Sequence, residues 1–214
     1  MALGITLGVA QGSRAGSGID RWATFLTLAL YSTPVFWLGQ VLMVVFGEKL
    51  GWWPTGGIHD PVTWASASAL GRTADLLWHL FLPALALGLV GAAGTARYQR
   101  AQMLEVVGQD FVRTARAKGL AQRAVLWRHA LRNALLPTIT LIGLSLPALL
   151  SGAVLVETVF AWPGMGLLTT DAISRRDYPL VTGAAILAGV MVVLGNLLAD
   201  LLSRAADPRT RTVG

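Results

Sequence analysis

Long apolar stretches dominate the pattern of hydrophobic and polar positions along the chain. Four of them contain no Asp, Glu, Lys or Arg, and each is longer than 20 residues: 22–47, 76–96, 133–156 and 178–199. A helix of about 20 apolar residues crosses the roughly 30 Å hydrocarbon layer of a bilayer. Ordinary soluble domains do not contain four such runs between charged loops. We therefore predict an all-α, polytopic transmembrane helical bundle with four complete spans, forming a single domain over residues 1–214.

The N-terminal segment, residues 1–13, is also apolar but too short to span a bilayer. Gly4 and Gly8 stand at the spacing of a GxxxG helix-packing motif. No basic residue precedes the apolar part, which makes the segment a poor signal peptide. We predict a partial span, the end of a helix whose beginning is missing.

Lys and Arg are distributed unevenly between the segments that connect the spans. Thirteen of the 17 fall in one set, which comprises residues 14–21, the loop 97–132 and the C-terminal tail. The other set contains only four: Lys49, Arg72, Arg175 and Arg176. Because cytoplasmic loops carry an excess of Lys and Arg, we predict that the first set is cytoplasmic and that residues 48–75 and 157–177 are external.

This topology accounts for much of the net charge of +6. The basic residues accompany no nucleic-acid-binding motif and no run of stacking aromatics, so we expect no nucleic-acid partner. Aromatic residues gather near the predicted outer interface, as in the aromatic belts of membrane proteins: Trp52, Trp53, Trp162 and Tyr178.

The cytoplasmic loop carries its charge on a helix–glycine–helix pattern. Asp110 suits the start of a helix and Lys118 its end, because of the helix dipole, and Gly119 follows as a C-terminal cap. A second apolar periodicity begins after Gly119 and runs into the third span. Two interpretations remain open, a polybasic face attracted to anionic lipid and a short helix that docks on a soluble partner.

This loop resembles the signature of the membrane-spanning subunit of ABC importers, E-A-A-x3-G-x9-I-x-L-P. Ala115, Gly119 and Leu131 match it, whereas four positions depart: Arg113, Thr114, His129 and Arg132. The departures resemble the dipeptide/oligopeptide/nickel permease family, whose form is "DFVRTARAKGL" followed by "RHALRNALLP". The stretches "STPVFWLG", "ETVFAWPGMGLL", "RRDYPLV" and "DPRTR" are similar to that family too, and favour the first of its two paired permease types.

The resemblance implies a set of partners. The loop would form coupling helices that dock on an ATP-hydrolysing subunit through eight residues: Arg113, Thr114, Ala115, Arg116, Ala117, Lys118, Gly119 and Leu120. A second permease subunit, two cytoplasmic ATP-binding subunits, an external substrate-binding protein and membrane lipid would complete the system. The chain would reside in a bacterial or archaeal plasma membrane, the inner membrane if Gram-negative, and import short peptides, nickel or another small solute. Family members usually have six spans, so we expect the first span and a long external loop to be absent here.

The chain should not be an enzyme or bind a cofactor directly. It contains no GxxxxGK[ST] phosphate loop, so the resemblance implies that the partner subunits use the ATP. The spans contain no charged residue, and His59, His79 and His129 are too scattered to suggest a metal site. An intramembrane enzyme needs activated groups that the spans lack, and a proton-coupled secondary transporter usually places an ionisable residue in its path. The secondary transporter is the main alternative function.

An external segment is a second candidate contact surface. It contains "WPGMG" and charged residues beyond it, and six positions could contact the binding protein: Trp162, Pro163, Gly164, Asp171, Arg175 and Asp177. A simple turn stabilised by Pro163, Gly164 and Gly166 explains the segment equally well.

The predicted topology can be tested directly, because the chain has no cysteine. In intact cells, an impermeant thiol reagent should label Asp171→Cys and leave Arg116→Cys unlabelled. Permeabilised cells, in which both positions should react, provide the control. Labelling of position 116 from outside intact cells would overturn the orientation.

Overall fold

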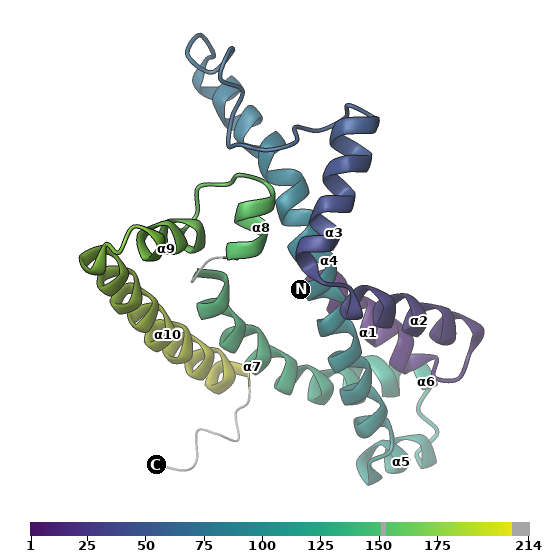
Figure 1. The fold of residues 1–214 in the computed structure, drawn as a ribbon. Coiled ribbons are helices and arrows are strands. Elements are labelled where there is room, and N and C mark those ends of the chain that lie inside the picture. Colours follow the sequence, from purple (N-terminus) through teal and green to yellow (C-terminus); the bar gives the residue numbers. More distant parts are fainter. Residues whose placement is uncertain (151–152, 207–214) are drawn as a thin grey trace. The chain divides into compact units, whose positions relative to one another are not determined.

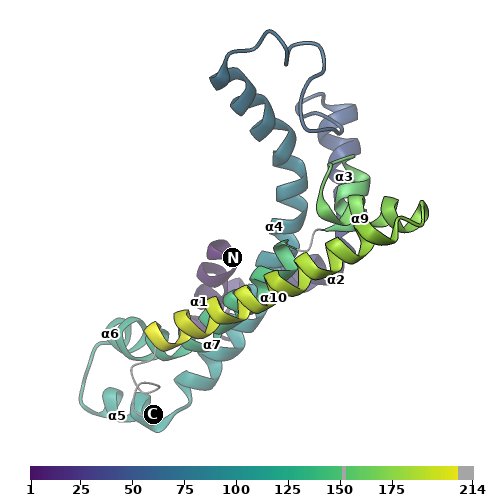
Figure 2. The ribbon, with the colours of Figure 1, turned by 90° about the vertical axis from the view of Figure 1, so that its left-hand side faces the viewer.

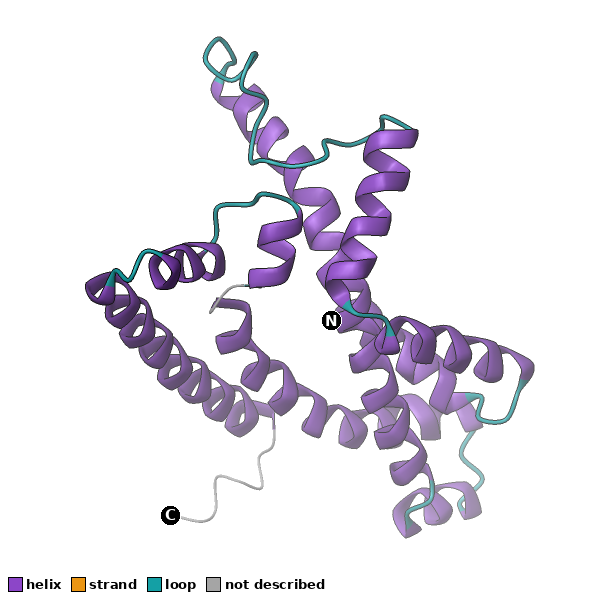
Figure 3. Ribbon diagram, in the orientation of Figure 1, coloured by secondary structure: helices purple, strands orange, loops and turns teal. Residues whose placement is uncertain are grey.

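The computed structural model describes residues 1–150 and 153–206, and all the regular structure of these residues is helical (Figures 1 and 3). Helices suit a membrane protein because they satisfy their backbone hydrogen bonds internally. The chain divides into two compact units. Unit 1 contains residues 1–32, 90–146 and the described residues from Leu194 on, and unit 2 contains residues 33–89 and 147–193.

In the described part of the chain, two helices are long and apolar enough to cross a membrane by themselves, α4 (Ala69–Val107) and α10 (Tyr178–Ala206). A third candidate arises among the described residues if α2 (Gly18–Ser32) is combined with the pair α3 (Val35–Leu42) and π-helix η1 (Met43–Lys49). At 1.5 Å per residue, the 39 residues of α4 extend over about 58 Å, nearly twice the hydrocarbon thickness. Helix α4 therefore contains the expected span 76–96 and continues into the expected loop 97–132 (Figure 2).

Two of the expected spans are not single helices. The span 22–47 is interrupted because α2 ends at Ser32 and α3 begins only after Pro34, which has no backbone N–H to continue the ladder. The span 133–156 falls on α7 (Leu131–Leu150) and the short α8 (Val154–Val159), and residues 151–152 between them lie outside the described part. A stretch without charged residues shows that the segment can lie in hydrocarbon, but it does not show that the segment forms one continuous helix.

In unit 1, the partial span expected at residues 1–13 is helix α1 (Ala2–Ser13), which packs closely on α4 through glycines (Figures 1 and 2). A Cβ atom at Gly4 would lie 2.5 Å from the carbonyl oxygen of Ala92. A Cβ at Gly8 would collide with the carbonyl oxygen of Ala96. The GxxxG spacing thus serves close backbone approach, as expected from the sequence.

A partly buried ion pair joins α2 to α4 in the same unit. The guanidinium of Arg100 donates to both carboxylate oxygens of Asp20, at 2.8 and 2.9 Å. Asp20 is 2% exposed, and it also accepts hydrogen bonds from the Gly16 amide and the Thr24 hydroxyl. Bidentate geometry and extra donors are the conditions under which a buried charge is tolerated. The pair fixes the position of α2 against α4.

In unit 2, an apolar cluster joins α3, the first part of α4 and α8. Its buried members are Leu42, Leu82, Ala86, Val156 and Phe160. Beside it, the Trp53 ring stacks on those of Trp78 and Phe81, with centroids 5.4 and 4.7 Å apart. Unit 2 also contains η1, α9 (Met165–Ser174) and the first part of α10, up to Val193.

The packing of α1 on α4 makes a testable prediction about two glycines. Gly8→Ala should destabilise the purified transporter by about 1–3 kcal/mol, because the added methyl overpacks the interface. Gly88→Ala is the matched control, since a Cβ there would meet nothing within 4 Å and Ala is the better helix former. Thermal unfolding of both variants gives the comparison. Equal stability of the two would contradict the close packing.

Candidate functional site

The first helix that lies wholly within the predicted cytoplasmic loop is α5 (Asp110–Ala117). Gln109 precedes it in an extended conformation, Asp110 occupies the first turn and Arg116 the last, so that the charges complement the helix dipole. The helix ends as the Lys118 amide donates to Thr114 O at 3.1 Å and the Gly119 amide donates to Arg116 O at 2.9 Å. The predicted glycine cap is confirmed.

Gly119 is required for its conformation and not for space. Its φ of +75° lies in the left-handed region, which costs other residues about 1–2 kcal/mol. A Cβ at this position would meet nothing within 4 Å. The turn therefore has space for a larger side chain, but residues that disfavour the left-handed conformation would destabilise it.

Burial separates Ala115 from the other seven predicted docking residues. Val112 and Ala115, on one face of α5, are 0% and 6% exposed and belong to the apolar core of unit 1. Ala115 thus packs against the core and is not available to contact a partner. The other seven are exposed: Arg113, Thr114, Arg116, Ala117, Lys118, Gly119 and Leu120. We call these seven the α5 surface, and it carries three of the predicted positive charges.

Beyond Gly119, the chain returns to helix without a long loop. It forms α6 (Gln122–Ala124), π-helix η2 (Val125–Ala130) and then α7, as the helix–glycine–helix pattern predicted. Val125 and Ala130 are fully buried in the same core as Val112. The side chains of Arg123, Arg128 and His129 lie outside the described residues.

A buried polar link fixes α7 to α4 near this core. The side-chain amide of Gln99 donates to the Ala134 carbonyl at 3.2 Å, and the Thr138 hydroxyl donates to the Gln99 side-chain oxygen at 2.6 Å. Gln99 and Thr138 are both 0% exposed. The sequence analysis did not identify this pair, since a lone Gln and a lone Thr in apolar helices give no spacing signal. The link makes α4, α7 and α5 one packed group.

The candidate surface that the sequence predicts to be external is partly assembled in unit 2. Pro163, Gly164, Asp171 and Arg175 line one cavity of about 690 Å³, together with Met165, Leu167 and Leu168. Asp171 and Arg175 form an exposed ion pair at 2.9 Å. The two other predicted residues do not line this cavity.

Those two residues have local roles. Trp162 is half-buried, and its backbone amide donates to the Glu157 carbonyl at 2.8 Å. Asp177 accepts a hydrogen bond from the Leu180 amide at 3.1 Å, which caps the start of α10. The segment is therefore both a structured turn and an accessible surface, and the two sequence-based interpretations are compatible.

The buried side chain of Glu157 holds this turn in place through two hydrogen bonds. Its buried carboxylate accepts one hydrogen bond from the Ala153 amide at 2.9 Å and another from the Leu167 amide at 2.7 Å. It therefore caps the N-terminal turns of α8 and α9 together. A Cβ at Gly164 would collide with the same carboxylate, which explains the glycine. This cap emerges only from the fold, because the Leu167 amide lies on a different helix from Glu157.

The described residues contain no group of three or more His, Cys, Asp or Glu side chains that could hold a metal ion.

Comparisons with known proteins extend over almost the whole chain. A family model described as "Binding-protein-dependent transport system inner membrane component" matches residues 4–212. The chain is 42% identical over 209 residues to the oligopeptide transport system permease protein AppB of Bacillus subtilis, covering 98% of this chain and 64% of that protein. It is 44% identical over 220 residues to the di/tripeptide transport system permease protein DppB of Pseudomonas aeruginosa, covering 97% and 66%.

A third relative gives the same coverage. The dipeptide transport system permease protein DppB of Escherichia coli is 42% identical over 225 residues, which cover 98% of this chain and 66% of that protein. The chain thus spans slightly less than two thirds of the length of these relatives.

The Glu157 cap makes a prediction about stability. Glu157→Gln keeps one acceptor but turns an NH₂ group toward a backbone amide, so it should cost about 1–3 kcal/mol. Asp171→Asn is the control, because it removes only one partner of an exposed ion pair worth less than about 1 kcal/mol. Thermal unfolding of the two purified variants distinguishes them. A Glu157→Gln protein as stable as Asp171→Asn would refute the double cap.

Proposed function

We propose that this chain, which belongs to the family of inner-membrane components of binding-protein-dependent transport systems, forms part of the path by which an ATP-driven importer moves short peptides across the plasma membrane. Peptides are favoured over nickel because the relatives at 42–44% identity are named as oligopeptide, di/tripeptide and dipeptide permeases. The chain acts as a transport subunit, and ATP is hydrolysed elsewhere in the assembly.

The proposed assembly contains a second permease subunit, two cytoplasmic ATP-binding subunits and an external substrate-binding protein, in a bacterial or archaeal membrane. The family name supports the binding protein, since it describes a binding-protein-dependent system. In our proposal the chain crosses the membrane with four spans and has one further partial span. This places α5 in the cytoplasm and α9 outside, as the distribution of Lys and Arg predicts.

The observation that carries the proposal is the α5 surface. A short helix exposes its basic face while its opposite face is locked into the core through Val112 and Ala115. Lipid attraction requires charge alone, but it does not require a helix held rigidly at a left-handed glycine. A rigid, exposed helix fits a groove on a protein partner, and we assign that partner as the ATP-binding subunit.

The fold suggests how a push on α5 would reach the membrane. Val112 and Ala115 of α5 share one apolar cluster with Met103 of α4 and Ala134 of α7. The Gln99 hydrogen bonds join α4 to α7 directly. Because a close-packed core transmits displacement with little compression, closure of the ATP-binding subunits would move α4 and α7 with α5.

We further propose that the cavity beside α9 receives part of the external binding protein. Its lining combines apolar side chains with the Asp171–Arg175 ion pair, so a charged group of the partner could pair with Asp171 or Arg175 in place of this contact. The Glu157 cap keeps the Pro163–Gly164 turn and the first turn of α9 in one geometry. A preformed surface costs less ordering entropy on association.

The function and the docking surface can be tested together in proteoliposomes that contain the assembled transporter. ATP-dependent uptake of a labelled tripeptide should depend on the binding protein and resist competition by nickel ions. Gly119→Val should lower uptake and peptide-stimulated ATP hydrolysis by roughly tenfold, because a β-branched residue disfavours the left-handed turn by about 1–2 kcal/mol.

Gly119→Asn is the matched control, since Asn adopts the left-handed conformation most readily among residues with a side chain, and it should retain most of the uptake. Uptake unaffected by Gly119→Val would remove the docking proposal. If nickel ions stimulated ATP hydrolysis and peptides did not, the proposed substrate class would be wrong.

A further inference from the structure

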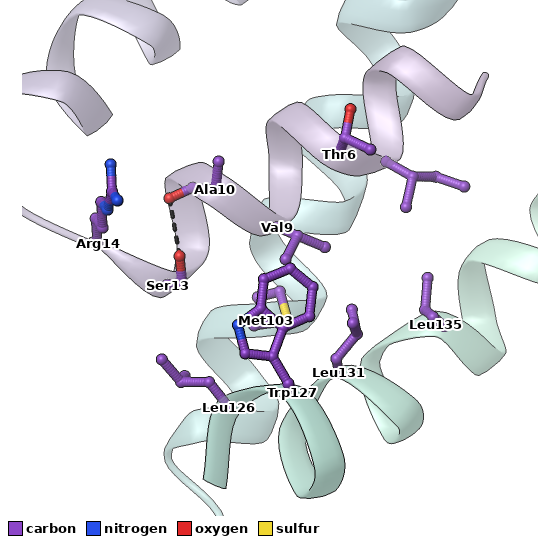
Figure 4. Close-up of a pocket in the computed structure, with 11 residues that line it drawn as sticks. Thr6, Val9, Ala10, Ser13, Arg14, Met103, Leu126, Trp127, Leu131 and Leu135 are labelled. Carbon is purple, nitrogen blue, oxygen red and sulfur yellow. Dashed lines mark hydrogen bonds between the residues drawn. The ribbon is translucent and has the colours of Figure 1, made fainter. Parts of the chain in front are cut away.

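A second cavity, of about 580 Å³, lies within unit 1 and is not explained by peptide transport. It is formed by α1, by Met103 of α4 and by residues of η2 and α7, and Figure 4 shows its lining. Buried Val9 and Met103 contribute to this lining. Its apolar wall is completed by Leu126, Trp127, Leu131 and Leu135. Its volume lies in the range of roughly 300–1,000 Å³ that is usual for small-molecule sites.

The polarity of the lining changes from one end of the cavity to the other. Thr6 and Leu135 lie toward one end in Figure 4, whereas Ser13, Arg14 and Leu126 lie toward the other. The Ser13 hydroxyl donates to the Ala10 carbonyl, so the end of α1 is locally satisfied. Among the described side chains that line the cavity, Arg14 is the only one with a formal charge, so the lining is apolar in its middle and cationic at the end of α1.

Arg14 is exposed and immediately follows the last residue of α1. Within the described part of the chain, no carboxylate lies at ion-pair distance from its guanidinium. Trp127 is 63% exposed even though it lines the apolar wall, and exposed indoles of this kind anchor proteins at membrane interfaces. In the proposed topology, this end of α1 faces the cytoplasmic leaflet, where anionic lipids concentrate.

We infer that this cavity binds one anionic phospholipid of the cytoplasmic leaflet, with acyl chain against Leu131 and Leu135 and headgroup near Arg14. The inference rests on the proposed membrane orientation. An apolar trough that ends at Arg14, whose guanidinium has no carboxylate partner among the described residues, matches an amphiphile with an anionic head, whereas a free phosphate would leave the trough unfilled. The lipid would lie against Met103, beside the core that supports α5.

The test uses the absence of cysteine in the chain. Ala10→Cys, which lies on the cavity lining, is labelled with bimane in the assembled transporter in phosphatidylcholine nanodiscs. Phosphatidylglycerol or phosphatidylcholine with brominated acyl chains is then added as a quencher. Brominated phosphatidylglycerol should reach half-maximal quenching at about a fivefold lower mole fraction, as expected for one basic residue near the headgroup.

Variants separate the specific site from general attraction to the membrane. Arg14→Gln should abolish the preference for phosphatidylglycerol, and Arg14→Lys should retain most of it. Arg21→Gln, which removes another exposed charge outside the cavity, should leave the preference unchanged.

Equal quenching by both lipids in the parent protein would overturn the inference. So would a lack of quenching by either, because that result means that a protein segment or a second copy fills the cavity. Tripeptide uptake measured on the same preparation in proteoliposomes is a separate readout. Loss of uptake activity with the lipid preference intact would contradict the proposed function and leave the lipid site standing.

Discussion

Burial around Met103 is the interaction on which the candidate site depends. Met103 is fully buried in α4, and its cluster draws residues from α1, α5, η2 and α7: Val9, Val112, Ala115, Val125, Ala130 and Ala134. Val112 and Ala115 occupy one face of α5, so their burial turns the basic residues outward. Hydrophobic contact orients the helix, and the orientation makes the charges available to a partner.

The same core connects the two sites proposed in unit 1. Val9 and Met103 belong to the cluster that supports α5, and they also line the amphipathic cavity beside α1. The glycines of α1 bring its backbone against α4 and so define one wall of that cavity. A lipid in the cavity would therefore contact the packed group that we propose to couple ATP hydrolysis to transport.

The sequence predicted several particular features correctly. Gly119 ends α5 with positive φ, the residues 76–96 and 178–199 lie within α4 and α10, and the family resemblance is confirmed. The bounds of the expected spans differ from the bounds of the helices, because charge marks where a chain leaves the hydrocarbon and not where a helix ends. Within the expected span 22–47, Pro34 separates two helices.

Some features of the candidate sites follow from the sequence alone, and others depend on the tertiary structure. Charge and local periodicity by themselves determined that the chain is a helical membrane protein with a basic helix–glycine–helix loop, because both depend on neighbouring residues. Only the tertiary structure decided that Ala115 faces inward, that Glu157 caps two helices, and that Arg14 lines one end of an apolar cavity. Each of these depends on residues far apart in the sequence, whose proximity no local pattern records.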